Sequence, residues 1–318
     1  MSDSFTIVLD DNRFLRDICG PQDENLRGLE HLLGARVVAK GNEVILDSAD
    51  TETKELFSNL IGRMKAHRKA GQVVTPNVVK TIFSSLTQNG EEKTDMLSDL
   101  NISIPSSPKV FPRNYHQAAY IDAMSSNDIV FGIGPAGTGK TFLAVAHALK
   151  EILERKKKKL ILTRPVVEAG ESLGFLPGDL AQKISPYLRP LYDAMDRLIS
   201  YQVLNRLEES RIIEIAPLAY MRGRSLSESY IILDEAQNTT REQMKMFLTR
   251  IGENSKAIIT GDITQIDLPG KQQSGLIHAM QVLSSIDEIR FCHFESADVV
   301  RNGLVRKIVH AYEREEAR

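Results

Sequence analysis

Two kinds of hydrophobic pattern alternate over residues 1–92. Short runs of apolar and β-branched residues predict strands, and apolar residues that recur every three or four positions predict amphipathic helices. Strands are predicted at 5–9, 35–39 and 43–47, the last two forming a hairpin that turns at Gly41-Asn42. Helices are predicted at 23–33, 51–69 and 76–86. This part of the chain is therefore expected to form a small α+β domain.

Residues 93–112 follow neither pattern. Glycine, proline, serine and charged residues gather at 88–93 and 101–112 without a clear period. Such a composition is typical of a domain boundary, so we predict a linker at 93–112 with an isolated strand at 102–104.

The pattern changes again after the linker, and residues 113–318 are expected to form a second domain. Short, continuously apolar runs alternate with helical segments, which is typical of parallel strands buried on both faces of a sheet. The runs are 128–133, 159–163, 212–215, 230–234, 257–260 and 289–294. The predicted fold class is α/β, with a parallel-sheet domain preceded by the small α+β domain.

Composition supports a folded protein of two domains. The 318 residues exceed what one small core needs, and 42% hydrophobic with 26% charged residues argue against disorder. The formal net charge of −2 gives no global reason for a nucleic-acid or membrane partner. The basic run at 155–159 favours a solvated helix end, with contact to a nucleic-acid backbone as the alternative.

The predicted location is the cytoplasm. Cys19 and Cys292 lie in different halves of the chain without metal-ligand spacing, as expected for idle thiols in a reducing compartment. No apolar run approaches the roughly 18 residues that span a bilayer, so no membrane association is expected. The N-terminus lacks the basic start and the apolar stretch of a signal peptide.

The strongest chemical signal follows the strand predicted at 128–133. The next segment matches the G-x-x-x-x-G-K-[ST] phosphate-binding loop and consists of Gly134, Pro135, Ala136, Gly137, Thr138, Gly139, Lys140 and Thr141. Glycines let backbone N–H groups curl around phosphates, and the N-terminus of the following helix adds partial positive charge. Lys140 is expected to reach the β- and γ-phosphates of ATP, and the Thr141 hydroxyl to bind Mg²⁺. A glycine-rich turn without a ligand is the alternative.

A second metal-binding group is predicted at the end of the strand at 230–234. Four apolar residues lead into Asp234 and Glu235, which places both carboxylates at the edge of the sheet where α/β folds bind ligands. Asp234 is expected to bind Mg²⁺, and Glu235 to act as general base toward water. A helix N-cap is the alternative role for an acidic strand end.

The strand at 257–260 also ends in polar residues. Gly261 is expected to allow close approach of neighbouring groups. Asp262 and Gln265 are candidates for sensing the γ-phosphate or placing the water, and Gln265 is included among the predicted catalytic residues. A turn formed by Gly-Asp is the structural alternative.

Together these elements resemble the PhoH-like protein family, ATPases related to the core of superfamily 1 helicases. Over residues 113–312 the resemblance also rests on TRPVVEAGE (163–171), LGFLPG (173–178), YMRGRS (220–225), DEAQN (234–238), TGD (260–262) and DVVR (298–301). It implies a protein that binds ATP with Mg²⁺, hydrolyses it, and acts in RNA metabolism as an RNA-stimulated, helicase-like ATPase. RNA is the implied partner, and a homo-oligomer, with a hexameric ring as one form, is the implied assembly.

The resemblance also implies how adenine is recognised. Gln117 precedes the first strand of the second domain, where helicase relatives use a glutamine to read the adenine edge, with Tyr115 or Tyr120 stacking on the base. A polar residue between helices is the alternative for Gln117.

The small domain resembles a KH-like module. A KH fold clamps nucleotide backbone in a G-x-x-G loop between two helices. The matching segment, Gly20-Pro21-Gln22-Asp23, lacks the second glycine and carries an acid. Assembly, or RNA binding through another surface, is therefore the alternative to clamping.

A guanidinium is expected at the γ-phosphate, either from this chain or from a neighbouring subunit. Arg301 begins the last predicted helix, which suits a subunit edge, and it is the predicted catalytic arginine. Arg164, Arg222 and Arg224 are the alternatives, and the last two could instead contact a phosphate of RNA. For any one of them, an ordinary surface arginine is the default interpretation.

Two other functions remain open at this point. An ATP-gated scaffold would recruit an RNA-processing enzyme, turn over slowly and not unwind RNA. The single α/β unit after residue 113 argues against a monomeric motor with two such domains, and an oligomer that completes the site in trans would resolve this. A small-molecule kinase is less favoured, because Glu235 beside Asp234 suits water as the acceptor. Stimulation of hydrolysis by RNA would separate the scaffold from the helicase-like ATPase.

Overall fold

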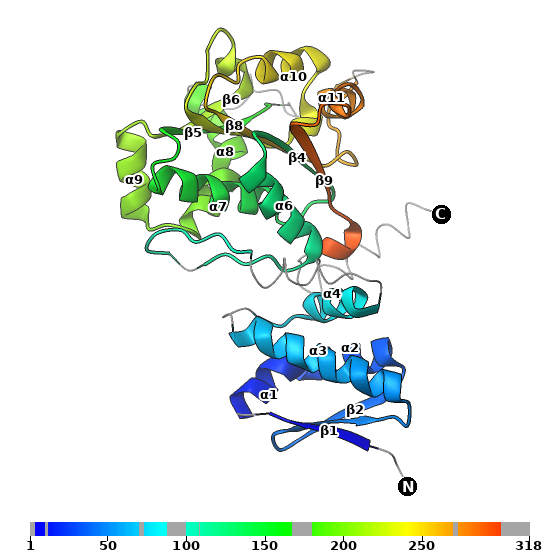
Figure 1. Cartoon of the computed structure of the whole chain (residues 1–318). Helices are drawn as coiled ribbons and strands as arrows, with labels where there is room; N and C mark the ends of the chain where they lie inside the picture. Colours follow the sequence, from blue (N-terminus) through cyan, green and yellow to red (C-terminus); the bar gives the residue numbers. More distant parts are fainter. Residues whose placement is uncertain are drawn as a thin grey trace. The chain divides into compact units, whose positions relative to one another are not determined.

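The computed structural model describes residues 4–9, 12–69, 73–87, 100–107, 109–166, 180–269 and 273–299. The chain divides into two compact units (Figure 1). The first comprises Met1–Asn101 with Phe111–Ala119, and the second comprises Ile102–Val110 with Tyr120–Arg318. Within the segment expected to be a linker, Ile102 and Val110 form an isolated antiparallel bridge and group with the second unit.

The first unit is a small α+β unit with a three-stranded antiparallel sheet. Its strands are β1 (Ser4–Val8), β2 (Arg36–Lys40) and β3 (Glu43–Asp47), in the order β1-β3-β2. Its helices are α1 (Asn12–Cys19), α2 (Glu24–Leu33), α3 (Thr51–Lys69) and α4 (Pro76–Thr87). The predicted strands, their hairpin and the three predicted helices are confirmed.

One face of this sheet forms the core of the first unit. Val37 and Leu46 on the strands pack with helix residues such as Leu60, and all three are buried. Helix α1 has only 8 residues and is absent from the sequence-based prediction. Its apolar residues Phe14, Leu15 and Ile18 do follow helical spacing, so the sequence carries a short helical signal that the prediction omits.

The second unit contains a six-stranded sheet in which all neighbouring strands are parallel. The strand order is β6-β5-β7-β8-β4-β9. The strands are β4 (Ile129–Ile133), β5 (Lys159–Arg164), β6 (Ile213–Pro217), β7 (Ser229–Leu233), β8 (Lys256–Gly261) and β9 (Ile289–His293). Every strand predicted from a continuous apolar run is confirmed, with small differences at the ends.

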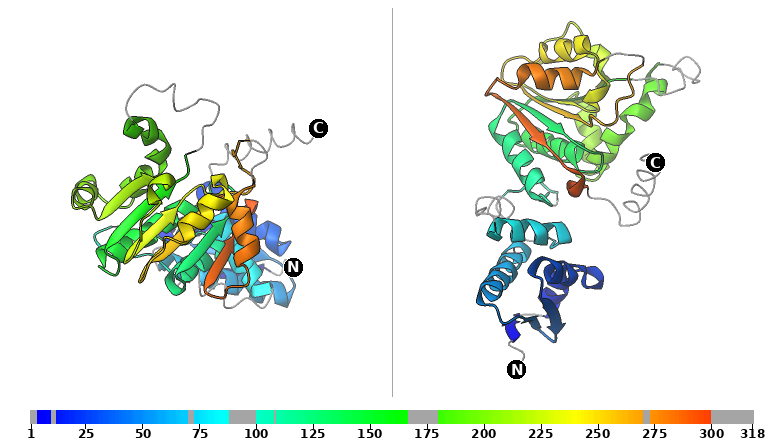
Figure 2. Two further views of the ribbon diagram at one scale, coloured as in Figure 1. Left: turned by 90° about the horizontal axis from the view of Figure 1, so that it is seen from above. Right: turned by 90° about the vertical axis from the view of Figure 1, so that its right-hand side faces the viewer.

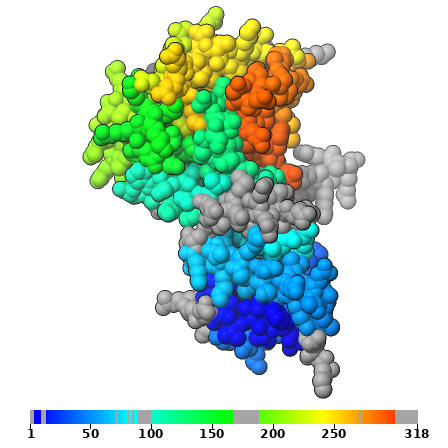
Figure 3. All heavy atoms as spheres, in the orientation of Figure 1, coloured from blue at the N-terminus to red at the C-terminus, as the bar shows by residue number. Residues whose placement is uncertain are grey.

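Helices cover both faces of this sheet, as the side view in Figure 2 shows. One face packs on α7 (Lys140–Leu153), α8 (Leu180–Asp196), α9 (Tyr201–Glu209) and the part of α6 (Tyr115–Ser126) that begins at Tyr120. The other face packs on α10 (Arg241–Leu248) and α11 (Gly275–Leu283). These last two helices contact each other and lie side by side at the surface (Figure 3). Among the described helices, none is both long enough and apolar enough to cross a membrane.

The parallel sheet brings the predicted motifs to one edge. Because all strands point the same way, their carboxyl ends meet, and α/β folds bind ligands at that edge. The P-loop follows β4, and Asp234 and Asp262 directly follow β7 and β8. Arg164 is the last residue of β5. Segments that are far apart in the sequence are therefore adjacent in this unit.

Candidate nucleotide-binding site

The P-loop has the backbone shape that its glycines permit. Gly134 directly follows β4 with a φ of 148°, and a Cβ atom there would lie 2.4 Å from the carbonyl oxygen of Phe294. Any larger residue would therefore force the loop away from the sheet. The Gly134 N–H donates to the carbonyl oxygen of Gly261 at 3.1 Å, which ties the loop to β8.

Lys140 lies at the centre of the loop as the first residue of α7. Its ammonium donates to the carbonyl oxygens of Gly134 at 2.6 Å and Pro135 at 2.8 Å, and the residue is only 7% exposed. The pKa of Lys140 is lowered, mainly because the residue is buried. The negative charges of Asp262, Asp234 and Glu235 act in the opposite direction with smaller effect. A cation surrounded in this way is placed where the motif predicts phosphate contacts.

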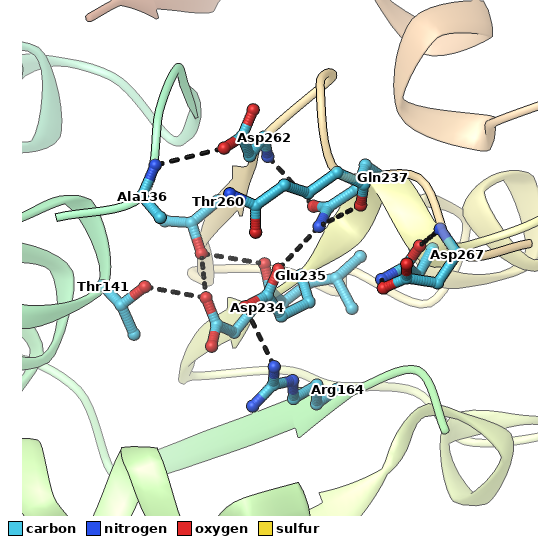
Figure 4. Close-up of polar contacts among 12 residues, drawn as sticks. Ala136, Thr141, Arg164, Asp234, Glu235, Gln237, Thr260, Asp262 and Asp267 are labelled. Atoms are coloured by element: carbon cyan, nitrogen blue, oxygen red, sulfur yellow. Dashed lines mark hydrogen bonds and ion pairs between the residues drawn. The ribbon is translucent and has the colours of Figure 1, made fainter. Parts of the chain in front are cut away.

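Asp234 connects the P-loop to the neighbouring strands (Figure 4). Its Oδ1 accepts hydrogen bonds from the hydroxyls of Thr141 and Thr260, each at 2.7 Å. Asp234 is 6% exposed, so this carboxylate is held in a largely desolvated place. Thr141 and Asp234 thus present adjacent oxygens, as the predicted metal site requires.

The Thr141 hydroxyl and the Asp234 carboxylate are oxygen ligands of the kind that Mg²⁺ would use. The described residues contain no group of three or more His, Cys, Asp and Glu that could hold a metal ion. Mg²⁺ usually binds through one or two protein oxygens together with waters and substrate phosphates. Thr141 and Asp234 would supply the protein oxygens, and Mg²⁺ would neutralise phosphate charge.

Glu235 is held on both carboxylate oxygens. Its Oε1 accepts a hydrogen bond from Arg164 Nη2 at 2.9 Å, and its Oε2 accepts one from Gln237 Nε2 at 2.6 Å. The residue has a left-handed backbone with φ of 52°, a conformation that costs energy for any residue with a side chain. The turn takes the chain from β7 into the short 3-10 helix η4 (Ala236–Asn238).

Gln237 joins three parts of the site. Besides binding Glu235, its Nε2 donates to the carbonyl oxygen of Gln265 at 3.1 Å, and its Oε1 accepts from the Asp262 N–H at 3.0 Å. The side chain is buried, with 1% exposure. Gln237 lies in the DEAQN segment (234–238), which predicts no separate role for it. Its only local signal is a polar residue shortly after a buried strand, and its partners Asp262 and Gln265 are distant in sequence.

We expect Gln237→Leu to lower the free energy of unfolding by about 1–3 kcal/mol. Leucine has a similar size but leaves the buried N–H of Asp262 without its acceptor. Urea denaturation followed by circular dichroism measures the change. Gln281→Leu, at an exposed position of α11, is the matched control. Equal stability of the two variants would contradict the role of the Gln237 amide.

Asp262 links β8 to the P-loop. Its Oδ2 accepts the Ala136 N–H at 3.1 Å, and its Oδ1 accepts the Thr264 hydroxyl at 2.6 Å. The close approach predicted at Gly261 is confirmed, because a Cβ atom there would lie 2.5 Å from Leu276 Cδ2. A turn at Gly261-Asp262 is therefore compatible with the predicted role of Asp262 near the γ-phosphate.

A cavity of about 230 Å³ lies among these groups. It brings together most of the predicted site residues from three separate segments. Its lining consists of Ala136, Gly137, Gly139, Lys140, Thr141, Phe142, Asp234, Glu235, Gly261, Asp262 and Gln265. The lining offers the Lys140 ammonium, the backbone of the P-loop, the hydroxyl–carboxylate pair of Thr141 and Asp234, and the two further carboxylates of Glu235 and Asp262. Such a site can bind a phosphate chain and activate water beside it.

Several described residues that were predicted to contact the nucleotide are not part of this lining, namely Gly134, Pro135, Thr138, Tyr115, Gln117 and Tyr120. Gln117 belongs to the first unit, where its Oε1 accepts the Arg113 N–H at 2.7 Å and its own N–H donates to Asn114 at 2.8 Å. Its adenine role stays a prediction. Tyr120 is fully buried with its ring edge-on to that of Phe294, so it offers no open face for stacking. Arg301 lies outside the described residues.

The other candidate arginines have separate environments. Arg164 binds Glu235, as described above. Arg224 donates two hydrogen bonds to the carboxylate of Glu214, at 2.6 and 2.8 Å, which commits it to an ion pair. Arg222 is exposed.

The basic run before β5 contacts neighbouring acidic and polar groups. Lys156 pairs with Glu154 at 2.8 Å, and Lys158 pairs with Glu228 at 2.6 Å. These contacts fit the interpretation of a solvated helix end.

Comparison with known proteins identifies the family of this chain. The family model described as PhoH-like protein matches residues 109–313. A PhoH-like protein of Mycobacterium tuberculosis is 48% identical over 299 residues, covering 94% of this chain and 85% of the relative. One from Bacillus subtilis is 47% identical over 297 residues and 93% of each chain. Protein PhoH of Escherichia coli is 39% identical over 279 residues, covering 84% of this chain and 78% of the relative. The resemblance inferred from the motifs is confirmed, and the chain belongs to the PhoH-like protein family.

Proposed function

We propose that this protein binds ATP with Mg²⁺, hydrolyses it, and does so faster when single-stranded RNA is bound. The observation that carries the proposal is the cavity in which Lys140, the Thr141–Asp234 pair and Glu235 face one space. Each group is of the type that phosphoryl transfer requires, and each lies at the carboxyl edge of the sheet.

In the proposed reaction, a water oxygen attacks the γ-phosphorus of ATP. The bond from that phosphorus to the β,γ-bridging oxygen breaks, and ADP leaves with the electron pair. Glu235 accepts the proton of the attacking water, and Lys140 stabilises negative charge that spreads over the phosphate oxygens. The N–H groups of the P-loop hold the remaining phosphates.

The contacts of Glu235 support activation by a second ligand. A general base must accept a proton from water, yet both oxygens of Glu235 accept hydrogen bonds from Arg164 and Gln237. Slow hydrolysis in the absence of a partner is therefore expected, and a change that moves Arg164 would raise the rate.

We expect single-stranded RNA to raise the steady-state rate of ATP hydrolysis severalfold. Release of phosphate is measured with and without an RNA oligonucleotide, at saturating ATP and Mg²⁺. Added EDTA should stop hydrolysis, because it would remove the Mg²⁺ that Thr141 and Asp234 would hold and that would neutralise phosphate charge. A rate that depends on Lys140 but is indifferent to RNA would contradict the RNA part of the proposal.

A second candidate is an ATP-gated scaffold that recruits an RNA-processing enzyme and turns over slowly. The doubly held Glu235 favours it as well, because a restrained base suits a long-lived ATP-bound state. The two candidates differ in the RNA assay above.

In either case the proposed setting is the cytoplasm, where the free thiols of Cys19 and Cys292 stay reduced. A homo-oligomer that completes the site with Arg301 of a neighbouring copy belongs to the same proposal.

A further inference from the structure

We propose that the loop after β6 binds single-stranded nucleic acid through Tyr220 and Arg222. The inference rests on the proposed function and names the surface that would receive RNA. In the bound state a nucleobase would stack on Tyr220 and a neighbouring phosphate would contact Arg222.

The loop begins at the edge of the sheet that carries the nucleotide site. The 3-10 helix η3 (Leu218–Met221) directly continues β6, whose carboxyl end lies at the same edge as those of β5 and β7. β6 is the outermost strand on its side of the sheet. A strand of nucleic acid could therefore approach the loop without crossing the ATP cavity.

The loop is anchored firmly on both sides of its exposed part. Leu218 and Met221 are buried in the core, with exposures of 2% and 0%. Gly223 turns the chain with a φ of 77°, and Arg224 is then fixed by its two hydrogen bonds to Glu214 in β6. A rigid platform loses little conformational freedom when a ligand binds.

Tyr220 and Arg222 are the groups that this anchoring presents to solvent. Tyr220 is 53% exposed and Arg222 is exposed, whereas Tyr120 and Tyr230 are fully buried. Residues 218–225 include no acidic side chain, and the carboxylate of Glu214 is neutralised by Arg224. An aromatic face stacks on any base and a guanidinium binds phosphate, which is how single strands are held without sequence preference.

The β-sheet connects this loop directly to the general base, Glu235. Pro217, immediately before η3, is in register with Arg164 across the β5–β6 pair. Arg164 in turn holds Glu235 Oε1 at 2.9 Å. The proposed binding surface and the nucleotide site are therefore joined through neighbouring strands of one sheet.

Binding is tested on the full chain by fluorescence anisotropy of a labelled oligouridine. Tyr220→Ala should weaken binding about tenfold, because one base loses its stacking partner. Tyr220→Phe should bind like the wild type, since the ring face is retained. Arg222→Gln should weaken binding and make it less sensitive to salt. Tyr201→Ala is the matched control, because Tyr201 is 70% exposed on α9.

The same variants separate this inference from the proposed function. Tyr220→Ala should raise the RNA concentration that gives half-maximal stimulation about tenfold while hydrolysis without RNA continues at the wild-type rate. Wild-type affinity of Tyr220→Ala, an equal loss in Tyr201→Ala, or failure of the wild type to bind would overturn the inference. RNA binding that depends on Tyr220 but leaves hydrolysis unchanged would support the site and contradict the RNA-stimulated ATPase.

A DNA oligonucleotide of matching length is the second arm. Equal affinity for both would assign the site to single-stranded nucleic acid in general. Tighter binding of RNA would add recognition of the 2′-hydroxyl. Either result supports a site that stacks bases and binds phosphate.

Discussion

Replacing Lys140 with alanine is expected to lower the rate of ATP hydrolysis by about 10²–10³-fold, the effect of removing one preorganised charge from a transition state. The ammonium is nearly buried and donates to the carbonyl oxygens of Gly134 and Pro135. Phosphate oxygens entering the cavity would compete for the same donor. The change is measured as steady-state phosphate release at saturating ATP.

The controls for Lys140 separate charge from position. Lys150→Ala removes a lysine from the same helix but outside the cavity lining, and it should leave the rate unchanged. Lys140→Arg keeps the positive charge and therefore tests its position. The larger, planar guanidinium does not fit the nearly buried place of the ammonium, which is 7% exposed and lies beside two carbonyl oxygens. Thermal melting verifies that each variant is folded. Near-normal hydrolysis by folded Lys140→Ala would refute the phosphate role of this loop.

Glu235→Gln should lower the rate constant for hydrolysis by about 10²–10⁴-fold while ATP binding is retained, because general-base catalysis contributes on that scale. Lys140, Thr141 and Asp234 keep their own contacts in this variant. The amide would still accept from Arg164, but its NH₂ group would face the Nε2 donor of Gln237. Binding of a fluorescent nucleotide and single-turnover hydrolysis measure the two effects separately.

The comparison for Glu235 is Glu253→Gln, at an exposed position outside the cavity. It removes the same charge from the chain and should hydrolyse ATP at the wild-type rate. If Glu235→Gln also does so, the base is another group, and Asp262 is the next carboxylate in the cavity. Loss of nucleotide binding together with hydrolysis would instead assign Glu235 a structural role through Arg164 and Gln237.

Much of this molecule follows from local sequence. Continuous apolar runs identify the strands of the parallel sheet, because a strand buried on both faces has no solvent side to make polar. The P-loop is recognisable because its glycines, lysine and threonine act within one short segment and its neighbouring strand and helix. The placement of Asp234 at a ligand-binding edge follows from its position after β7.

The helices differ in how well the sequence predicts them. Helix α3 matches its predicted range from Thr51 to Lys69, because a long amphipathic segment repeats its pattern several times. Helix α1 offers only 8 residues, and its identity depends on packing against the rest of the first unit. Propensity alone decides little in so short a segment.

The sequence by itself determined the two kinds of unit, the phosphate-binding loop and the family, because those signals lie in contiguous residues. Only the tertiary structure decided how the site is connected. Ala136 and Asp262 are 126 positions apart, and Arg164 and Glu235 are 71 apart, yet each pair is hydrogen-bonded. The central place of Gln237 likewise depends on β7 and β8 being neighbours in the sheet. Side-chain contacts of this kind are fixed by the order of the strands in the sheet, which no local pattern of apolar and polar residues records.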